Sequence, residues 1–295
     1  MYTLENCEKL WDEAGRHGSV EERIERTKRW EPYYGYLAKK ALSAPEAESF
    51  AEPPLVTYMV KEGILTPDST VLDIGAGMGS YALSFAKNCR EVSALEPVGA
   101  CLDVLQHKAA QHGLRNIHGI HDYWEHFSPT KVYDMTFSSM CPAICNTEEL
   151  RRMEAMTGKS CCLVAVQRGS YDKHRKTMMA GLQIKPQGGM TTEAIHYINA
   201  LYLMGRQPNV KFFEFRKTSR VSAETVLEQY PIYFEIFGIE KETSVPFLQQ
   251  YLTEHAVDGF LEDESYLRQA LIYWHKEQAK FSVRITPAMT TRNWQ

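Results

Sequence analysis

The stretch of sequence that decides the fold is Val71-Leu-Asp-Ile-Gly-Ala-Gly-Met-Gly-Ser80. An apolar run enters a loop that contains Gly75, Gly77 and Gly79, and a helix is predicted directly after it, over residues 81–87. A strand, a glycine loop and a helix in this order are typical of the carboxyl edge of an open α/β sheet, where such sheets bind ligands. Glycines permit positive φ angles and let a ligand approach the backbone closely. The stretch therefore predicts a ligand-binding loop.

Strands and helices alternate outward from this loop. Short apolar runs predict strands, and apolar residues at three-to-four spacing predict the helices between them. The predicted strands cover residues 71–74, 91–96, 116–120, 132–138, 160–166, 210–221 and 281–285. This alternation predicts right-handed crossovers and an α/β fold with a doubly wound, mostly parallel sheet.

The distribution of strands predicts the domain organisation. Residues 1–66 read as helices without a strand, and Ser19 with Glu22 forms a capping box at the start of one of them. An acidic, aromatic stretch over about residues 222–278 reads as helical. We therefore expect a helical N-terminal extension, followed by a sheet domain over residues 67–295 that carries a helical insertion at about 222–278.

Composition and charge limit the class of protein. Of 295 residues, 44% are hydrophobic and 24% are charged, which is typical of globular proteins. The net charge of −4 lacks the basic surplus that neutralises phosphates, so we expect no nucleic-acid partner. No apolar run reaches the roughly 18 residues of a membrane-spanning helix, and the N-terminus is too charged for a signal peptide. We expect no membrane partner and a cytoplasmic location.

The cysteines and histidines do not predict a metal site. The seven cysteines are scattered and odd in number, so reduced thiols are expected rather than a disulfide framework. None has the paired spacing of a zinc site. His118, His121 and His126 crowd around Asp122, but sequence alone does not make them converge. We predict no metal.

Two acids narrow the kind of ligand. Glu96 closes the second strand, where a carboxylate can accept hydrogen bonds from both hydroxyls of a ribose. Asp73 lies two residues before the first glycine, where it would repel a diphosphate and attract an ammonium group. The dinucleotide fingerprint also needs a glycine where this chain has Ser80. The ligand should therefore carry a ribose and a positive centre, without phosphates.

At these residues the chain resembles the class I S-adenosylmethionine-dependent methyltransferases. Their first motif, an apolar pair, Asp, an apolar residue and GxGxG, matches residues 71–79 without a gap. The resemblance implies a seven-stranded Rossmann-like sheet, Asp73 and the glycine backbone at the methionine end of the cofactor, and Glu96 at the ribose. It also implies Asp122 at the adenine amino group, with the Tyr123 backbone amide facing the ring. The residues expected to bind S-adenosylmethionine are Asp73, Gly75, Ala76, Gly77, Gly79, Glu96, Pro97, Asp122, Tyr123 and Ser138.

Catalytic residues are harder to predict, because methyl transfer mainly requires alignment of the nucleophile with the methyl carbon. The loop after the fourth strand lacks the Asn/Asp-Pro-Pro-aromatic motif of enzymes that methylate bases or glutamine, and it offers Cys141 instead. His121 is a candidate general base, with a hydrogen-bonded loop histidine as the alternative. Tyr34 is the third candidate, because Tyr33, Tyr34 and Tyr36 can form an aromatic lid over the cofactor.

The resemblance favours one function over two others. The first is a methyltransferase that acts on a small-molecule acceptor, with S-adenosylhomocysteine as the product and a homodimer as one option for its assembly. The alternative is a non-catalytic S-adenosylmethionine-binding subunit that requires a partner. A nicotinamide-dependent oxidoreductase is disfavoured by Ser80 and Asp73. A basic run after the fifth strand is a further candidate as an anchor for an anionic acceptor, with a solvated basic face as the alternative. It consists of Arg168, Lys173, His174, Arg175 and Lys176.

Overall fold

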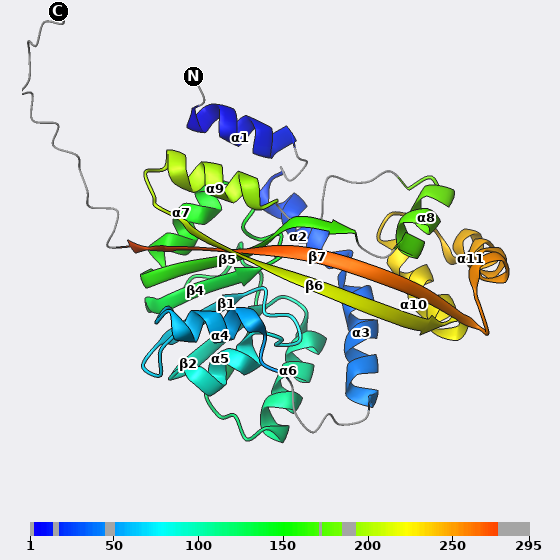
Figure 1. The fold of residues 1–295 in the computed structure, drawn as a ribbon, viewed down its shortest axis with the longest axis horizontal. Coiled ribbons are helices and arrows are strands. Elements are labelled where there is room, and N and C mark those ends of the chain that lie inside the picture. The colour runs from blue at the N-terminus through cyan, green and yellow to red at the C-terminus, as the bar shows by residue number, and fades with distance from the viewer. Residues whose placement is uncertain (1–2, 14–17, 45–50, 171–172, 185–192, 277–295) are drawn as a thin grey trace, which may run out of the picture.

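The structure is a computed structural model that describes residues 3–13, 18–44, 51–170, 173–184 and 193–276. Its centre is a seven-stranded sheet in the order β3-β2-β1-β4-β5-β7-β6 (Figure 1). The strands are β1 (Thr70–Ile74), β2 (Glu91–Glu96), β3 (Ile117–His121), β4 (Tyr133–Ser139), β5 (Thr157–Ser170), β6 (Asn209–Ser222) and β7 (Phe260–His275).

Strand directions make the sheet mostly parallel. β1 pairs in parallel with β2 and β4, β2 pairs in parallel with β3, and β4 pairs in parallel with β5. β7 lies between β5 and β6 and is antiparallel to both. Because helices join the parallel strands on both faces of the sheet, the predicted doubly wound, seven-stranded α/β fold is confirmed.

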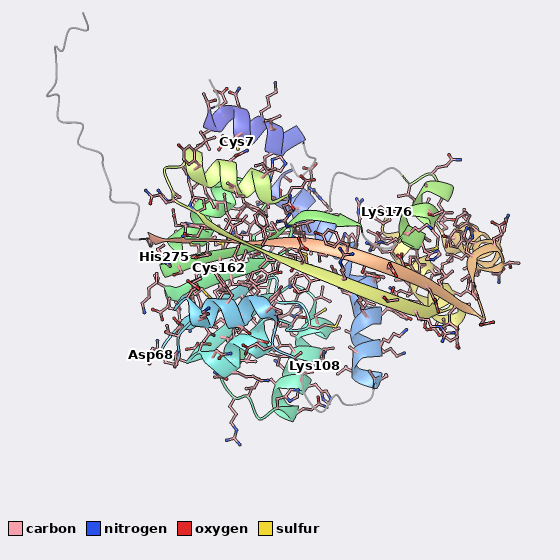
Figure 2. The ribbon with its side chains drawn as sticks, viewed as in Figure 1. Cys7, Asp68, Lys108, Cys162, Lys176 and His275 are labelled. Atoms are coloured by element: carbon pink, nitrogen blue, oxygen red, sulfur yellow. The ribbon has the colours of Figure 1, made fainter. Side chains whose placement is uncertain are left out.

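The helices of the sheet domain form two layers, one on each face (Figure 1). One layer packs Trp11 and Met153 against Leu72 and Ile74 of β1. The other packs α4, α5 and α6 against the opposite face, where Cys162 of β5 is fully buried (Figure 2). The helices of the first layer are α1 (Leu4–Glu13), α7 (Thr147–Ala155) and α9 (Ala194–Leu203), and those of the second are α4 (Pro54–Lys61), α5 (Ala82–Asn88) and α6 (Gly99–Gln111).

A third apolar cluster lies at the far end of the long β6–β7 ribbon (Figure 1). It is formed by α8 (Lys173–Gly181), α10 (Ala223–Glu235) and α11 (Lys241–His255) with the ends of β6 and β7, and we call it the insertion lobe. α3 (Glu31–Ser43) contacts both α10 of this lobe and α6 of the sheet domain. α3 therefore bridges the two parts of the molecule.

The N-terminal extension includes part of the main core. Cys7 and Trp11 of α1 are each 1% exposed and pack in the cluster that contains α9. The α2 helix (Val20–Lys28) is tied down by Arg23, which forms ion pairs with Glu149 at 2.8 Å and Glu125 at 3.5 Å. The predicted capping box is confirmed at the start of α2. Of the extension's helices, only α3 therefore stays a candidate lid.

The predicted insertion is too long. Its helices α10 and α11 end at His255, and the residues from Phe260 to His275 form β7 rather than a helix. This segment contains several good helix formers, but pairing on both sides with β5 and β6 overrides that local preference. The strand predicted at 281–285 lies outside the described residues. The division at residue 66 stays a prediction.

Candidate functional site

The glycine loop connects β1 to α5 and keeps one face open. Gly75, Gly77 and Gly79 have φ angles of 73°, 54° and 84°, a region that side chains other than glycine rarely adopt. A Cβ atom on Gly79 would lie 2.8 Å from the Leu105 side chain of α6, so this glycine is needed for packing. A Cβ atom on Gly77 would meet nothing within 4 Å. The open space above Gly77 is therefore available to a ligand.

The loop is held in place by the neighbouring strand. The backbone amides of Gly75 and Ala76 donate hydrogen bonds to the Leu95 carbonyl of β2, at 2.9 and 3.0 Å. These bonds pin the start of the loop against β2. The amide of Gly77 instead points at a side chain of β2, Glu96.

Asp73 is a buried acid that forms no ion pair with any residue in the described part of the chain. It lies on β1 and is 2% exposed. Burial, together with the nearby charge of Glu96, raises the pKa of the Asp73 carboxyl to about 8. A cationic ligand beside Asp73 would favour the carboxylate form and reverse this shift. The position therefore suits an ammonium group, as the sequence predicted.

Glu96 is a second buried acid, and the backbone holds it. Its Oε2 atom accepts a hydrogen bond from the Gly77 amide and its Oε1 atom accepts one from the Val98 amide, both at 2.9 Å. Burial raises the pKa of the Glu96 carboxyl despite these two bonds. Each carboxylate oxygen accepts more than one hydrogen bond, so both can still receive a ligand hydroxyl. The side chain is fixed beside the glycine loop.

Asp122 and Tyr123 follow the end of β3. They lie at the same edge of the sheet as Glu96, because His121 of β3 pairs with Glu96 of β2. Oδ1 of Asp122 accepts a hydrogen bond from the Tyr123 backbone amide at 2.8 Å. The amide expected to face an adenine ring is therefore engaged by Asp122 in this structure. The Tyr123 hydroxyl donates to Glu31 of α3, which links α3 to this edge.

His121, a predicted catalytic residue, also lies at this edge. Its Nε2 atom lies 2.9 Å from the carbonyl oxygen of Pro97. Because a carbonyl oxygen only accepts hydrogen bonds, the Nε2–H group is the donor. The side chain is therefore held by a hydrogen bond, as in the alternative that the sequence left open, although His121 is the last residue of β3 rather than a loop residue. β3 and β4 lie three strand positions apart, about 14 Å. His121 and Cys141 thus belong to different halves of the site.

Cys141 lies directly on the glycine loop, from the other side. A Cβ atom on Gly75 would overlap the Cys141 sulfur, so the two residues are in close contact. Burial raises the pKa of the Cys141 thiol to about 12, which keeps it protonated at neutral pH. Ser138, at the end of β4, is 2% exposed and donates a hydrogen bond to the Ile74 carbonyl at 3.2 Å.

Tyr34 reaches the site from α3. Glu96 and Cys141 are near enough to contribute, after burial, to raising the pKa of the Tyr34 hydroxyl. The side chain is nevertheless 39% exposed, which places it at the rim of the site rather than in the core. Its neighbours on α3 face the other way: the Tyr36 hydroxyl donates to Glu228 at 3.0 Å, and the Tyr33 hydroxyl accepts from Gln229 at 2.8 Å, both on α10. The structure thus brings Tyr34 to the site and assigns Tyr33 and Tyr36 to the contact with α10.

Two residues on the side of Cys141 and Tyr34 were not predicted as site residues from the sequence. Met140 precedes Cys141 and has a φ angle of 47°, a strained value for this residue type. Gln269 of β7 donates a hydrogen bond from Nε2 to the Met140 sulfur at 3.2 Å. Methionine gives no sequence signal for a positive φ angle, and Gln269 lay in a segment predicted to be helical. Only the strand pairing of β7 brings it to this edge.

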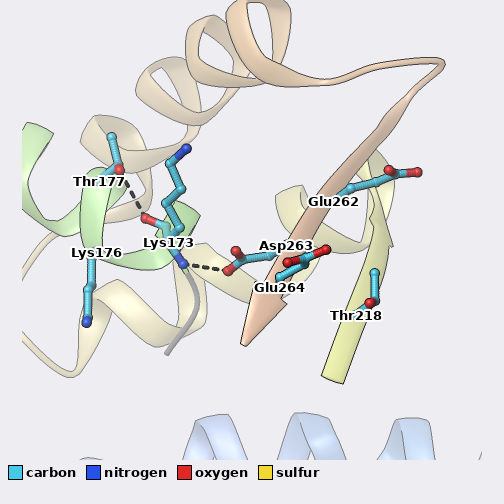
Figure 3. Close-up of a pocket in the computed structure, with 7 residues that line it drawn as sticks. All are labelled: Lys173, Lys176, Thr177, Thr218, Glu262, Asp263 and Glu264. Atoms are coloured by element: carbon cyan, nitrogen blue, oxygen red, sulfur yellow. Dashed lines mark hydrogen bonds between the residues drawn. The ribbon is translucent and has the colours of Figure 1, made fainter. Parts of the chain in front are cut away.

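The basic run after β5 lies away from the glycine loop. Lys173 and Lys176 of α8 line a cavity of about 630 Å³, and β7 lines its other side with acidic residues (Figure 3). The Lys173 backbone amide donates to Asp263 (Figure 3). Because acidic side chains share the cavity, it does not favour an anion. The residues that line it are Lys173, Lys176, Thr177, Thr218, Glu262, Asp263 and Glu264.

The described part of the chain contains neither a cluster of metal ligands nor a helix that could span a membrane. No group of three or more potential metal ligands converges there. None of the described helices is long and apolar enough to cross a membrane. All seven cysteines are free thiols.

Comparison with known proteins agrees with this geometry. Residues 71–157, from β1 to the start of β5, match the family model of a methyltransferase domain. The magnesium protoporphyrin IX methyltransferase of Synechocystis PCC 6803, solved with bound S-adenosylhomocysteine, shares the fold with a TM-score of 0.51 and 12% identity, over 86% of this chain and 99% of that one. Residues 71–157 therefore match a methyltransferase domain, and the chain shares the fold of a solved methyltransferase, in agreement with the resemblance seen in the sequence.

Relatives of known sequence match about a third of the chain. Protein-L-isoaspartate O-methyltransferases of Picosynechococcus sp. and Desulfotalea psychrophila are 30% and 34% identical over 106 residues, which cover 36% and 33% of this chain. The chain spans about half the length of these relatives, 48% in each case.

The comparisons also correct the predicted partners. An uncharacterized RNA methyltransferase of Streptococcus mutans is 38% identical over 58 residues, 20% of this chain and 13% of that one. A 23S rRNA (uracil(1939)-C(5))-methyltransferase of Yersinia enterocolitica is 31% identical over 116 residues, 38% of this chain and 25% of that one. The exclusion of nucleic acid is therefore wrong. That exclusion was based on the net charge of −4. Net charge is a sum over all residues, so it does not describe the charge of any one surface.

Proposed function

We propose that this chain is an S-adenosylmethionine-dependent methyltransferase. The observation that carries the proposal is the open space above Gly77, set between the buried Asp73 carboxyl and the amide-held Glu96 carboxyl. A ligand in this space would meet a backbone surface and two acids, which suits an ammonium group and a ribose. A diphosphate would be repelled.

The residues present fit this cofactor. We assign Asp73 to the ammonium group, Glu96 to the ribose hydroxyls and Asp122 to the adenine amino group, with the loop backbone along the cofactor. Bound S-adenosylmethionine supplies an electrophilic methyl group on a positively charged sulfur. The chain's task is then to hold the acceptor in line with that methyl group and to exclude water. Cys141 and Tyr34 lie on the side where an acceptor would approach, and we assign them to that task.

We further propose a small-molecule acceptor. α3 contacts both α6 and α10, so it crosses the approach to the glycine loop, and Tyr34 stands at the rim. A helix across the approach favours an acceptor small enough to pass beside it. A cytoplasmic location, inferred from the reduced cysteines, belongs to the same proposal.

Transfer of a labelled methyl group tests this proposal. The purified protein is incubated with methyl-labelled S-adenosylmethionine and with a metabolite extract, total RNA or a protein extract, and Gly77→Val serves as the inactive control. We expect label in the metabolite fraction. Label in RNA or protein would contradict the small acceptor but keep the activity. Binding of S-adenosylhomocysteine without any transfer would support the non-catalytic subunit instead.

A further inference from the structure

Gln269 of β7 is a buried amide whose hydrogen-bonding capacity is mostly unused. The side chain is 4% exposed, and its Nε2 atom donates to the Met140 sulfur at 3.2 Å. A thioether is a weak acceptor. Within the described residues, no donor forms a hydrogen bond with its Oε1 atom. Among the described residues, Oε1 is not one of the fully enclosed side-chain atoms that lack a partner, so this unpaired acceptor is open enough for a ligand to contact it.

Strand register places Gln269 beyond the carboxyl ends of the central strands. Leu163 of β5 lies level with Ser138 of β4, which in turn lies level with Ile74 of β1. Gln269 pairs with Val166, three residues further along β5. Three residues of a strand extend about 10 Å. Gln269 is therefore level with the loops that follow β1 and β4 rather than with the strands themselves.

The alternation of side chains places Gln269 on the face of Asp73. Asp73 pairs with Phe137 of β4, Phe137 pairs with Cys162 of β5, and Cys162 pairs with Tyr273 of β7. Gln269 is four residues from Tyr273, and residues an even number apart share a face. The buried acid and the buried amide thus lie on one face of the sheet, separated by the loop that carries Met140.

Met140 connects Gln269 to the glycine loop. Its amide donates to the Val164 carbonyl at 2.8 Å, and its strained backbone turns the chain so that the next residue, Cys141, lies on Gly75. Strained residues of this kind cluster at ligand sites. One short segment therefore contacts the cofactor loop through Cys141 and the Gln269 amide through Met140.

We propose that Gln269 recognises the methyl acceptor, through paired hydrogen bonds to a primary amide, lactam or imide. Nε2 of Gln269 would donate to the carbonyl oxygen of that group in place of the Met140 sulfur, and Oε1 would accept its N–H. This inference rests on the proposed function. Small amides or lactams and the imide of a pyrimidine base share this chemistry, so the experiment contains a probe for each source.

The Met140 methyl group reports on the Gln269 amide directly. The protein is labelled with ¹³C-methyl methionine, loaded with S-adenosylhomocysteine and titrated in NMR experiments with benzamide, uridine, benzoate or benzyl alcohol. Met140→Leu identifies the resonance. We expect benzamide or uridine to shift it saturably, at about tenfold higher affinity than benzoate or benzyl alcohol, because only the former offer the N–H that Oε1 accepts. The effective probe identifies the source.

The matched variant is Gln269→Met, which keeps a long, unbranched side chain and removes the amide. It should bind S-adenosylhomocysteine as the wild type does, which also shows that it is folded, and it should lose the preference for benzamide or uridine. Equal affinity for all four probes, no shift of the Met140 resonance, or an unchanged preference in Gln269→Met overturns the role of Gln269. Failure of the wild type to bind S-adenosylhomocysteine would instead overturn the proposed function on which it rests.

Discussion

The two halves of the site are built differently. The half around Gly77 comes from one short segment and the end of the next strand, and the backbone amides of Gly77 and Val98 hold Glu96 in place. The half around Cys141 is assembled from α3, the loop after β4 and β7, which are distant in the sequence. The first half depends on local conformation and the second on tertiary packing.

This difference suggests how the two halves respond to mutation. A change in the cofactor half should act on cofactor affinity and leave the rest of the molecule unchanged. A change in the acceptor half should act on turnover and leave cofactor affinity nearly unchanged. Four predictions on binding and turnover test this separation, and a fifth concerns the stability of the ligand-free protein.

The largest effect is expected at Gly77. A valine there adds a branched side chain at a φ angle of 54° and fills the space assigned to the cofactor. Calorimetric titration should show at least about a hundredfold loss of S-adenosylhomocysteine affinity, more than 2.7 kcal/mol. Gly205→Val is the matched control, because Gly205 also has a positive φ angle and open space. Equal affinity in both variants would remove the loop from the site.

Glu96→Ala should have the next largest effect. The variant loses the acceptor of the ribose hydroxyls, at a cost of about 1.5–3 kcal/mol in binding S-adenosylhomocysteine. Glu91→Ala is the control at the other end of β2, where Glu91 contacts Lys131 at the surface. If Glu91→Ala weakened binding as much as Glu96→Ala, the assignment of the ribose would be wrong. NAD binding in either variant would favour an oxidoreductase.

The raised pKa of the Asp73 carboxyl predicts that cofactor binding depends on pH. Its pKa is raised from 3.8 to about 8, so the side chain is mostly protonated at pH 6 and ionises as the pH approaches 8. If the ammonium group binds the carboxylate, affinity for S-adenosylhomocysteine should rise about tenfold per pH unit between pH 6 and 7.5. Asp73→Asn should bind weakly at every pH in this range. A flat wild-type profile would contradict the assignment.

The same shift predicts an opposite effect on the ligand-free protein. Because the folded-state pKa of Asp73 lies above its ordinary value, the folded state binds more protons, and stability is lost as the pH rises from about 4 to 8. Asp73→Asn removes this cost, so its melting temperature without ligand should exceed that of the wild type at pH 8. Thermal unfolding measures this directly, and a lower melting temperature for Asp73→Asn would contradict burial as the cause.

The smallest effect is expected on α3. Tyr34→Ala should lower methyl transfer about tenfold, about 1.4 kcal/mol in the barrier, with little change in S-adenosylhomocysteine affinity. Tyr36→Phe removes only the hydrogen bond to Glu228 of α10 and is the control, with less than about a twofold effect. A tenfold loss in Tyr36→Phe, with none in Tyr34→Ala, would mean that the contact with the insertion lobe matters and the rim position does not.

The fold was predictable where local sequence decides it. The strand and glycine loop at 71–79, the capping box at Ser19, and the alternation up to β5 all follow from short-range preferences. β7 was missed because its good helix formers are overridden by pairing with β5 and β6, which no local pattern encodes.

The candidate site divides in the same way. Asp73 and Glu96 were predicted because their distance from the glycines in sequence fixes their place in space. Met140 and Gln269 were not, since a positive φ angle on methionine and a pairing between distant strands leave no mark in the sequence. Tyr34 was predicted as one of three lid tyrosines, and only packing against α10 distinguishes it from Tyr33 and Tyr36.

The most direct test of the divided site is a crystal structure with S-adenosylhomocysteine. We predict that both ribose hydroxyls lie about 3 Å from the Glu96 carboxylate, that the ammonium group lies on the side of Asp73, and that the sulfur faces Cys141 and Tyr34. A ribose away from Glu96, or a sulfur that faces His121 at the β3 edge, would contradict the division of the site into a cofactor half and an acceptor half.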